Sequence, residues 1–354
     1  MRKVSLDNVK VGNRIALPIF SLNNSVLLAR GSELTPEIIN NLKQYGITEV
    51  YIDDGVSENI SVPEFIKKEI IHETKNQIKK IMDNLSIKTS TDGEFILEIV
   101  KNLIEEILQS HQVIVNLSDI RSIDDYMFTH SVNVAVFSLV TGITLGLEQD
   151  ELKNLGIGAI LHDVGKVRIN DRILKKPTSL TVEEYEEVRK HTVFGYEILG
   201  NSENIPSVAR EIALYHHERM DGSGYPYKLK GKEIPAEARI VAIADVFDAL
   251  TTDRIYRKKM HISHVVDYML SLSGKHFDKK ILEAFFRHVT NYPVGTGVVL
   301  NTGEKGLVFK YNSYSPNRPV VRILIDSNGQ KLSRYRELDL SHKPDYFIED
   351  VWNI

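Results

Sequence analysis

The chain of 354 residues is long enough for two or three domains at about 150 residues each. Its 44 basic and 48 acidic residues give a net charge of −4, which argues against a general nucleic-acid binder. The chain has no cysteine, which excludes disulfides, iron–sulfur clusters and a thiol nucleophile. Any bound metal must therefore be held by carboxylates and by some of the 12 histidines.

Residues 1–60 predict a small α+β unit with no residue that suggests chemistry. The N-terminus MRKVSLDNVKVG is not followed by a long apolar segment, so we expect no signal peptide. Apolar runs bounded by turn residues indicate strands, and a Thr-Pro pair indicates a helix start. The predicted elements are strands at 14–20 and 26–30 joined by a turn at 22–24, a helix from Thr35-Pro36 to Gly46, and a strand at 47–52.

Residues 61–111 predict two connector helices, because isoleucine, leucine and valine recur at helical spacing on both sides of a polar break at 86–93. Such helices can pack on the next domain or on a second copy, so they are compatible with a homodimer. Residues 112–290 predict an all-helical domain. Its segment 126–147 lacks Asp, Glu, Lys and Arg but contains several polar side chains, which favours a buried core helix over a membrane span.

From residue 291 the pattern changes to short strands separated by turn residues. Predicted strands lie at 295–300, 306–311 and 319–326, and they indicate a small β-barrel-like C-terminal module over 291–354. The whole chain is thus predicted to be a mainly α, multi-domain protein with a helical central domain. We expect it in the cytoplasm, with no membrane or nucleic-acid partner.

Histidines and aspartates on several apolar helices carry the strongest chemical signal. His162-Asp163 follows the apolar run 155–161, where an adjacent pair of this kind is costly unless it binds something. Taken alone, each such residue has a simpler interpretation as a core side chain with satisfied hydrogen bonds. The residues that accompany the pair are His130, His191, His216, His217 and Asp245.

Together these residues offer more ligands than the roughly four to six that one ion uses. The pattern therefore favours two metals bridged by a carboxylate, with Asp163 as the favoured bridge. Imidazole and carboxylate without thiolate favour iron or manganese, with zinc as a further option. Paired metals suit displacement at phosphorus, because they activate a hydroxide and stabilise the attacking and leaving oxygens.

The loop from Asp221 to Pro226 follows the tandem histidines and suits a wall against a substrate. Its glycines, among them Gly224, permit a tight turn close to a ligand. Tyr225 offers a flat face and a hydroxyl to a base or a phosphate. Most basic residues nearby are simply solvated, but Lys166 can assist a leaving oxygen, and Arg254 and Arg257 can clamp phosphates.

These motifs resemble the HD-GYP family over about residues 120–288. The resemblance rests on His162-Asp163-x-Gly165-Lys166, His216-His217, the loop at 221–226, and the segments 244–251 and 253–257. It implies a phosphodiesterase that hydrolyses cyclic di-GMP to pGpG, and further to GMP, through a hydroxide activated by two metals. The seven residues above would be the metal ligands, Asp163 and Lys166 the catalytic residues, and Asp248 a support behind the ligands. The implied substrate-binding residues are Gly224, Tyr225, Pro226, Arg254 and Arg257.

The chain departs from the family at two positions. Members with three metals carry a Glu four residues before the first ligand histidine, where this chain has Tyr126. Tyr126 shares a helix face with His130, so we expect it behind the ligands and expect two metals, iron or manganese. The turn Lys176-Pro177-Thr178-Ser179-Leu180 lacks the usual glycine, with little expected effect on chemistry.

Two other functions remain open. The chain could be a non-catalytic receptor for a cyclic dinucleotide, or a module that binds a diguanylate cyclase partner, although retention of all seven ligands argues against this. It could also be an HD-type hydrolase of another nucleotide, such as (p)ppGpp or a dNTP. The intact loop and the arginine pair argue against that alternative and favour a bacterial second-messenger phosphodiesterase.

Overall fold

The structure is a computed structural model that describes residues 1–20, 26–45, 47–55, 57, 59–62, 68–87, 93–109, 126–252, 260, 262–312 and 315–352. Contacts divide the chain into two compact units. One comprises residues 1–65, 122–124 and 289–354, and the other comprises residues 66–121 and 125–288. Each unit therefore joins segments that lie apart in the sequence, and the division into four consecutive regions stays a prediction.

The N-terminal part of the first unit contains short strands and one helix around a small apolar core. The helix α1 (Pro36–Gln44) begins as predicted, because the Thr35 hydroxyl accepts a hydrogen bond from the Ile38 N–H and Pro36 occupies the first turn. The predicted turn at 22–24 and Gly46 lie outside the described residues. The strands are β1 (Arg2–Ser5), β5 (Glu49–Asp53) and β2 (Arg14–Ile15), hydrogen-bonded antiparallel in that order, and the separate pair β3 (Ile19–Phe20) and β4 (Val26–Leu28).

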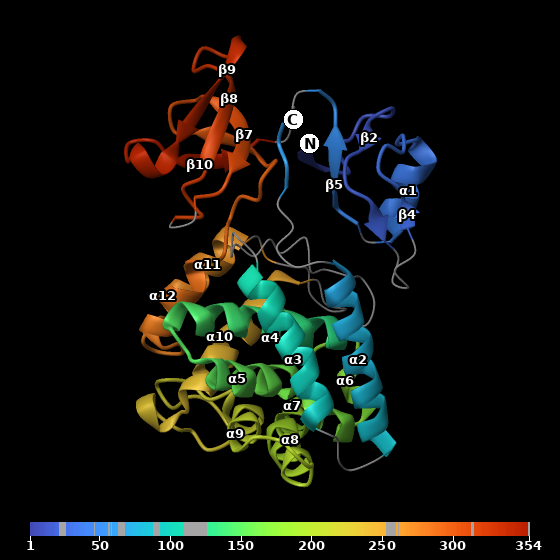
Figure 1. Cartoon of the computed structure of the whole chain (residues 1–354), viewed down its shortest axis with the longest axis vertical. Helices are drawn as coiled ribbons and strands as arrows, with labels where there is room; N and C mark the ends of the chain where they lie inside the picture. The colour runs from blue at the N-terminus through green and yellow to red at the C-terminus, as the bar shows by residue number, and fades with distance from the viewer. Residues whose placement is uncertain are drawn as a thin grey trace. The chain divides into compact units, whose positions relative to one another are not determined.

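The C-terminal module is a five-stranded antiparallel sheet with the order β10-β6-β7-β8-β9 (Figure 1). Its strands are β6 (Gly297–Leu300), β7 (Lys305–Lys310), β8 (Val320–Ile325), β9 (Lys331–Asp339) and β10 (Ile348–Val351). The first three confirm the predicted strands. The sequence analysis missed β9 and β10. Most side chains of β9 are exposed and charged and give no apolar alternation, and β10 is a strand of only four residues, two of them acidic. In the described part of the chain β9 and β10 remain the two edges, so the sheet is open and the barrel-like form is not confirmed.

The named elements of the second unit are all helices, joined by turns and loops in its described residues (Figure 1). Its longer helices are α2 (Lys68–Ile87), α3 (Gly93–Gln109), α4 (Tyr126–Leu145), α5 (Gln149–Leu161), α7 (Val182–Arg189), α8 (His191–Gly200), α9 (Ser207–Tyr215), α10 (Ala236–Thr251), α11 (Ile262–Ser271) and α12 (Lys279–Phe286). Short turns of helix lie at η1 (Val164–Arg168), α6 (Asp171–Leu174) and η2 (Gly231–Glu233).

The two predicted connector helices, α2 and α3, pack within this helical unit. α2 packs on α4 and η1, and α3 packs on α5. The face of α3 that contains Ile96, Val100 and Leu103 is buried. Gly156 of α5 allows close approach, because a Cβ there would lie 2.5 Å from the Val100 Cγ1. The predicted second copy is therefore not required to cover this apolar face.

Helix α4 is the central helix of the unit and packs on α2, α5, α10 and α12. Its window Phe128–Leu145 is long and apolar enough to cross a membrane, but 83% of that window is buried inside the structure. A helix enclosed by other helices in this way is the core helix that the sequence predicted. It brings the buried side chains of His130 and Asn133 into the interior.

Candidate metal centre

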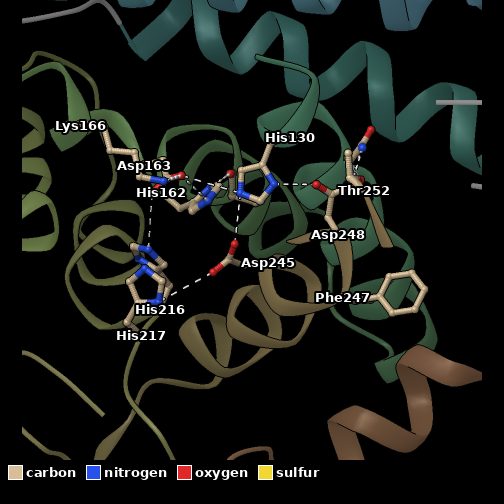
Figure 2. Close-up of polar contacts among 12 residues, drawn as sticks. His130, His162, Asp163, Lys166, His216, His217, Asp245, Phe247, Asp248 and Thr252 are labelled. Atoms are coloured by element: carbon tan, nitrogen blue, oxygen red, sulfur yellow. Dashed lines mark hydrogen bonds and ion pairs between the residues drawn. The ribbon is translucent and has the colours of Figure 1, made fainter. Parts of the chain in front are cut away.

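The seven predicted ligand residues come together from five helices of the second unit. Figure 2 labels all of them except His191. Most lie at helix ends, where the chain can aim consecutive side chains into one space. His130 comes from α4, His162 caps α5 and precedes Asp163, His191 begins α8, His216 caps α9 and precedes His217, and Asp245 lies in α10. They form two groups, and within each group the potential ligand atoms all lie within 4.8 Å of one another.

Asp163 belongs to one of these groups, but its two carboxylate oxygens face histidines of both. Oδ1 is 3.4 Å from Nε2 of His191 and 3.9 Å from Nε2 of His216. Oδ2 is 3.4 Å from Nε2 of His162 and 3.8 Å from Nε2 of His130. The first group is Asp163, His191, His216 and His217, and the second is His130, His162 and Asp245.

Three imidazole rings are oriented by backbone carbonyl groups behind them. Nδ1 of His162 lies 2.8 Å from the Ala159 oxygen, and Nδ1 of His191 lies 2.7 Å from the Val188 oxygen. Nδ1 of His216 lies 3.0 Å from the Ala213 oxygen. A carbonyl oxygen can only accept, so Nδ1 must carry the proton in each ring. The lone pair of each Nε2 is then directed into the centre, which is the tautomer that a metal requires.

His130 is oriented by a carboxylate instead. Its Nδ1 lies 2.7 Å from Oδ2 of Asp248, and its Nε2 lies 3.1 Å from Oδ1 of Asp245. Burial opposes the charged ring, but the hydrogen bonds to Asp245 and Asp248 outweigh it and raise the pKa of His130 to about 9. In the metal-free protein His130 is thus an imidazolium at neutral pH.

Three further histidines and Asp163 also have shifted pKa values. Burial lowers the pKa of His191 to about 4 and that of His217 to about 3, and it lowers the pKa of His216 well below its usual value. Burial opposes ionisation of Asp163, but Lys166 and His162 hold its pKa well below the ordinary value. Neutral imidazoles and an ionised carboxylate are the forms that bind divalent metals.

Two buried atoms at the centre support the fit of this site to a metal. Nε2 of His162 and Oδ1 of Asp163 are buried and make no hydrogen bond within the described part of the chain. A buried polar atom without a partner is costly, and a metal ion would satisfy both atoms at once. Nitrogen and carboxylate oxygen are ligands that iron, manganese and zinc accept.

One edge of the site is open to solvent. The side chain of His217 is 25% exposed and that of Lys166 is 26% exposed, whereas the other six ligand side chains are at most 10% exposed. Lys166 forms an ion pair with Oδ2 of Asp163 (Figure 2). We call the side chains of His217 and Lys166 the open edge of the site.

The loop after His217 lies against the open edge, and hydrogen bonds to the buried Glu218 side chain hold its backbone in place. The Tyr225 ring stacks on the His217 ring, with centroids 4.7 Å apart and planes at 27°. The buried Glu218 carboxylate accepts hydrogen bonds from the N–H groups of Tyr227 at 2.7 Å and Leu229 at 3.1 Å. Gly224 is required, because a Cβ there would lie 2.5 Å from the Glu218 Cα and 2.6 Å from the His217 oxygen. Pro226 follows Tyr225 in this loop.

Sequence reasoning missed three side chains that surround the site. Asn133 donates to Oδ1 of Asp248 at 2.6 Å, Glu218 holds the loop, and Arg189 contacts the Tyr225 ring. The spacing of Asn133, three residues after His130, could have indicated a shared helix face. Glu218 and Arg189 contact residues that lie far from them in the sequence, so no local spacing indicated their roles.

Some predicted residues cannot be placed. Arg254 and Arg257 lie outside the described residues, and so does the side chain of Tyr126, although α4 begins at that residue. Asp248, by contrast, lies directly behind His130, and the hydroxyl of Thr252 is 3.4 Å from its Oδ1 (Figure 2). The neighbouring Phe247 points away from the site (Figure 2).

The chain is similar in sequence to several known phosphodiesterases. A cyclic di-GMP phosphodiesterase of Pseudomonas aeruginosa is 32% identical over 233 residues, which are 66% of this chain and 56% of that protein. A cyclic di-GMP phosphodiesterase of Thermotoga maritima is 34% identical over 248 residues, which are 68% of this chain and 66% of that protein. A 3′3′-cGAMP-specific phosphodiesterase of Vibrio cholerae is 41% identical over 160 residues, which are 45% of this chain and 31% of that protein. The chain thus spans less than two thirds of the length of each of these relatives.

Two family models match the chain, one in the helical unit and one in the C-terminal sheet. A KOW domain associated with HD domain matches residues 297–354, which contain the five-stranded sheet. The HD domain model matches residues 102–281, half of the chain, and this range contains all seven clustered His and Asp residues. Together with the His162-Asp163 pair and the loop at 221–226, this match shows that the chain belongs to the HD domain family, as a member of its HD-GYP group.

Proposed function

We propose that the protein is a metal-dependent phosphodiesterase that hydrolyses cyclic di-GMP to pGpG and then to GMP. The observation that carries this proposal is the position of Asp163, whose two oxygens face two separate groups of buried ligands. The names of the relatives from Pseudomonas aeruginosa and Thermotoga maritima support the substrate.

The proposed cofactor is a pair of divalent ions, iron or manganese, with Asp163 as the bridge. His191, His216 and His217 would coordinate one ion. His130, His162 and Asp245 would coordinate the other. The 3.8 Å between Oδ2 of Asp245 and Nδ1 of His217 supports a short separation between the two groups. When bound, such a pair supplies a Lewis acid for the phosphate and a hydroxide at neutral pH.

The protein's own side chains would bind the substrate and handle the leaving group. Lys166 lies at the open edge beside Asp163, and we propose that its ammonium protonates the departing 3′-oxygen as the bond from phosphorus breaks. Tyr225 covers His217 and, with Gly224 and Pro226, forms a wall against the dinucleotide. Arg254 and Arg257 are proposed to bind the non-bridging phosphate oxygens.

A second candidate substrate is 3′,3′-cGAMP. The relative from Vibrio cholerae that is 41% identical is specific for this dinucleotide. The two substrates share the phosphodiester linkage and one guanine, so the same centre can serve both. The difference must come from side chains that contact the bases.

The direct test is turnover by protein loaded anaerobically with Mn²⁺ or Fe²⁺. We expect loss of cyclic di-GMP and appearance of pGpG and GMP on chromatography, and no turnover by the His162→Ala and Asp163→Ala variants. Elemental analysis of the same samples should give two ions per chain and a loss in both variants. No turnover with either metal, in folded protein that retains two ions, would contradict the proposal.

The location, the oligomeric state and the protein partner are further proposals, since the chain spans only part of the length of its relatives. We infer a cytoplasmic enzyme that acts as a homodimer and meets a diguanylate cyclase partner. Size-exclusion chromatography with light scattering tests the dimer. Co-purification with a purified diguanylate cyclase tests the partner, and cell fractionation tests the location.

A further inference from the structure

Arg189 lies next to the open edge, at the end of α7 and two residues before His191. Its guanidinium carbon lies 4.4 Å from the centroid of the Tyr225 ring. The Tyr225 ring in turn stacks on His217 at 4.7 Å. The Tyr225 ring therefore contacts both the guanidinium of a partly exposed arginine and the imidazole of a proposed metal ligand.

The donors of Arg189 are not consumed by this contact. A guanidinium over an aromatic face keeps its five N–H donors in its own plane, directed past the edge of the ring. Within the described part of the chain, Nη1 of Arg189 forms an ion pair with Glu186 at 2.5 Å, and that carboxylate is 57% exposed. Ion pairs this exposed contribute little and exchange readily with a ligand. The Tyr185 ring, 5.9 Å from the guanidinium carbon and 49% exposed, adds a second flat surface.

Distance from the centre decides which part of a dinucleotide meets Arg189. Lys166 contacts Asp163 directly, so it is the cation at the reacting phosphate. Arg189 is linked to His217 through the Tyr225 ring, which contacts both of them. In a nucleotide whose phosphate lies at the metal centre, the ribose separates the base from the phosphate. Because Arg189 is linked to the centre through Tyr225, it would meet the base and not the reacting phosphate.

The chemistry of the donors then selects the base. Guanine presents two acceptors, O6 and N7, on one edge, and arginine pairs with both at once. Adenine replaces O6 with an amino donor, which opposes the N–H donors of arginine. We propose that Arg189 is a specificity-determining residue that recognises one guanine of the cyclic dinucleotide, an inference that rests on the proposed function. The face of the Tyr225 ring positions the Arg189 guanidinium.

The test compares Arg189→Ala and Arg189→Lys with the unchanged protein on cyclic di-GMP, 3′,3′-cGAMP and cyclic di-AMP. Losing a two-point contact should lower kcat/KM for cyclic di-GMP on the order of tenfold to a hundredfold. The loss should lie in KM, since the base contact is the same before and during reaction. Because one guanine suffices, cGAMP should follow cyclic di-GMP, while cyclic di-AMP turnover should hardly change. Lysine keeps the charge but not the planar fork, so it should not restore the preference.

The matched control is Arg168→Ala. Arg168 also lies over an aromatic ring, Phe194 at 5.7 Å, and also pairs with a glutamate, Glu197 at 2.7 Å. Neither partner belongs to the loop at the open edge. This variant should leave the ratio between guanine and adenine substrates unchanged, and all variants should keep the metal content and melting temperature of the parent.

A readout without turnover separates this inference from the proposed function. Calorimetric titration of the metal-free protein with cyclic di-GMP and cyclic di-AMP should show a guanine preference that both Arg189 variants lose. Turnover with an unchanged substrate ratio in the variants overturns the inference and leaves the function standing. An equal fall for all three substrates also overturns it, because Arg189 would then only position Tyr225. If the parent shows no turnover but binds with a guanine preference that the Arg189 variants lose, recognition by Arg189 is supported and the proposed function is overturned.

Discussion

Oδ2 of Asp248 lies 2.7 Å from Nδ1 of His130, while Oδ1 of the same carboxylate accepts a hydrogen bond from Nδ2 of Asn133 at 2.6 Å. The Asp248 carboxylate is fully buried in α10. It therefore locks the His130 ring in one orientation and keeps Nε2 directed toward Asp245 and Asp163.

This relationship predicts that Asp248→Asn weakens metal binding without removing a ligand. An amide keeps the shape but loses the charge that orients His130, and such partners are typically worth about 10- to 100-fold in metal affinity. Competition with a metal-binding dye would measure the change. The control is Asp150→Asn, an exposed carboxylate paired with Lys153 at 2.7 Å, which should bind metal as the parent does. Equal affinity of parent and Asp248→Asn would refute this role.

Metal binding should release a proton from His130 at neutral pH. Its pKa of about 9 means that the metal-free ring is protonated at pH 7, and a metal must displace that proton. The apparent affinity should therefore rise with pH and level off above about 9. His191 and His217, with pKa values of about 4 and 3, are already neutral and add no such release.

Calorimetry checks this proton release. Titration of the metal at pH 7 in two buffers of different ionisation enthalpy should give enthalpies that differ in proportion to at least one proton, since a metal-bound hydroxide would release another. An enthalpy independent of the buffer would show that His130 is neutral in the metal-free protein. Repetition at pH 10 is the internal control, since the release should then be smaller by the proton of His130.

Gly165→Ala should disrupt the centre through the backbone. A Cβ at Gly165 would overlap the carbonyl oxygen of His191 and lie 2.5 Å from the Gly195 nitrogen. The new methyl group must push η1 away from α8, which separates Asp163 from His191. We expect a loss of stability of about 1–3 kcal/mol or more, together with a loss of metal.

Urea unfolding and elemental analysis measure the two effects. Gly200→Ala is the matched control, because it ends the same helix α8 and a Cβ there meets nothing within 4 Å. It should keep both the stability and the metal of the parent. Retention of two ions by Gly165→Ala would mean that this close approach does not determine the site.

Glu218→Gln should loosen the loop at the open edge. The buried carboxylate accepts from two backbone N–H groups, whereas an amide offers one oxygen and turns a donor toward the other N–H. Leaving that group unsatisfied costs about 1–3 kcal/mol. We expect lower stability and a higher KM for the dinucleotide, with metal content unchanged. Glu203→Gln, at an exposed position, is the control and should match the parent in all three measurements.

The helices and most of the candidate ligands could be predicted from the sequence, because the signals are local. Thr35-Pro36 sets the start of α1 through contacts within one turn, and the apolar run 155–161 places His162 at the buried end of α5. The motifs His162-Asp163 and His216-His217 are adjacent in sequence, so they could be recognised without knowledge of the fold. Exposed strands such as β9 carry no such local pattern, which is why it was missed.

Only the tertiary structure decided how these residues face one another. Which oxygen of Asp163 faces which histidines depends on five helices packed together, and no spacing in the sequence encodes it. The Tyr225 ring contacts Arg189 and His217, which lie 36 and 8 positions away in the sequence and meet it only after folding. The absence of cysteine already limited the metal ligands to imidazole and carboxylate, and the near-neutral charge argued against a general nucleic-acid binder. Packing then set the protonation of each group, because burial and neighbouring charge determine a pKa and both arise from long-range contacts.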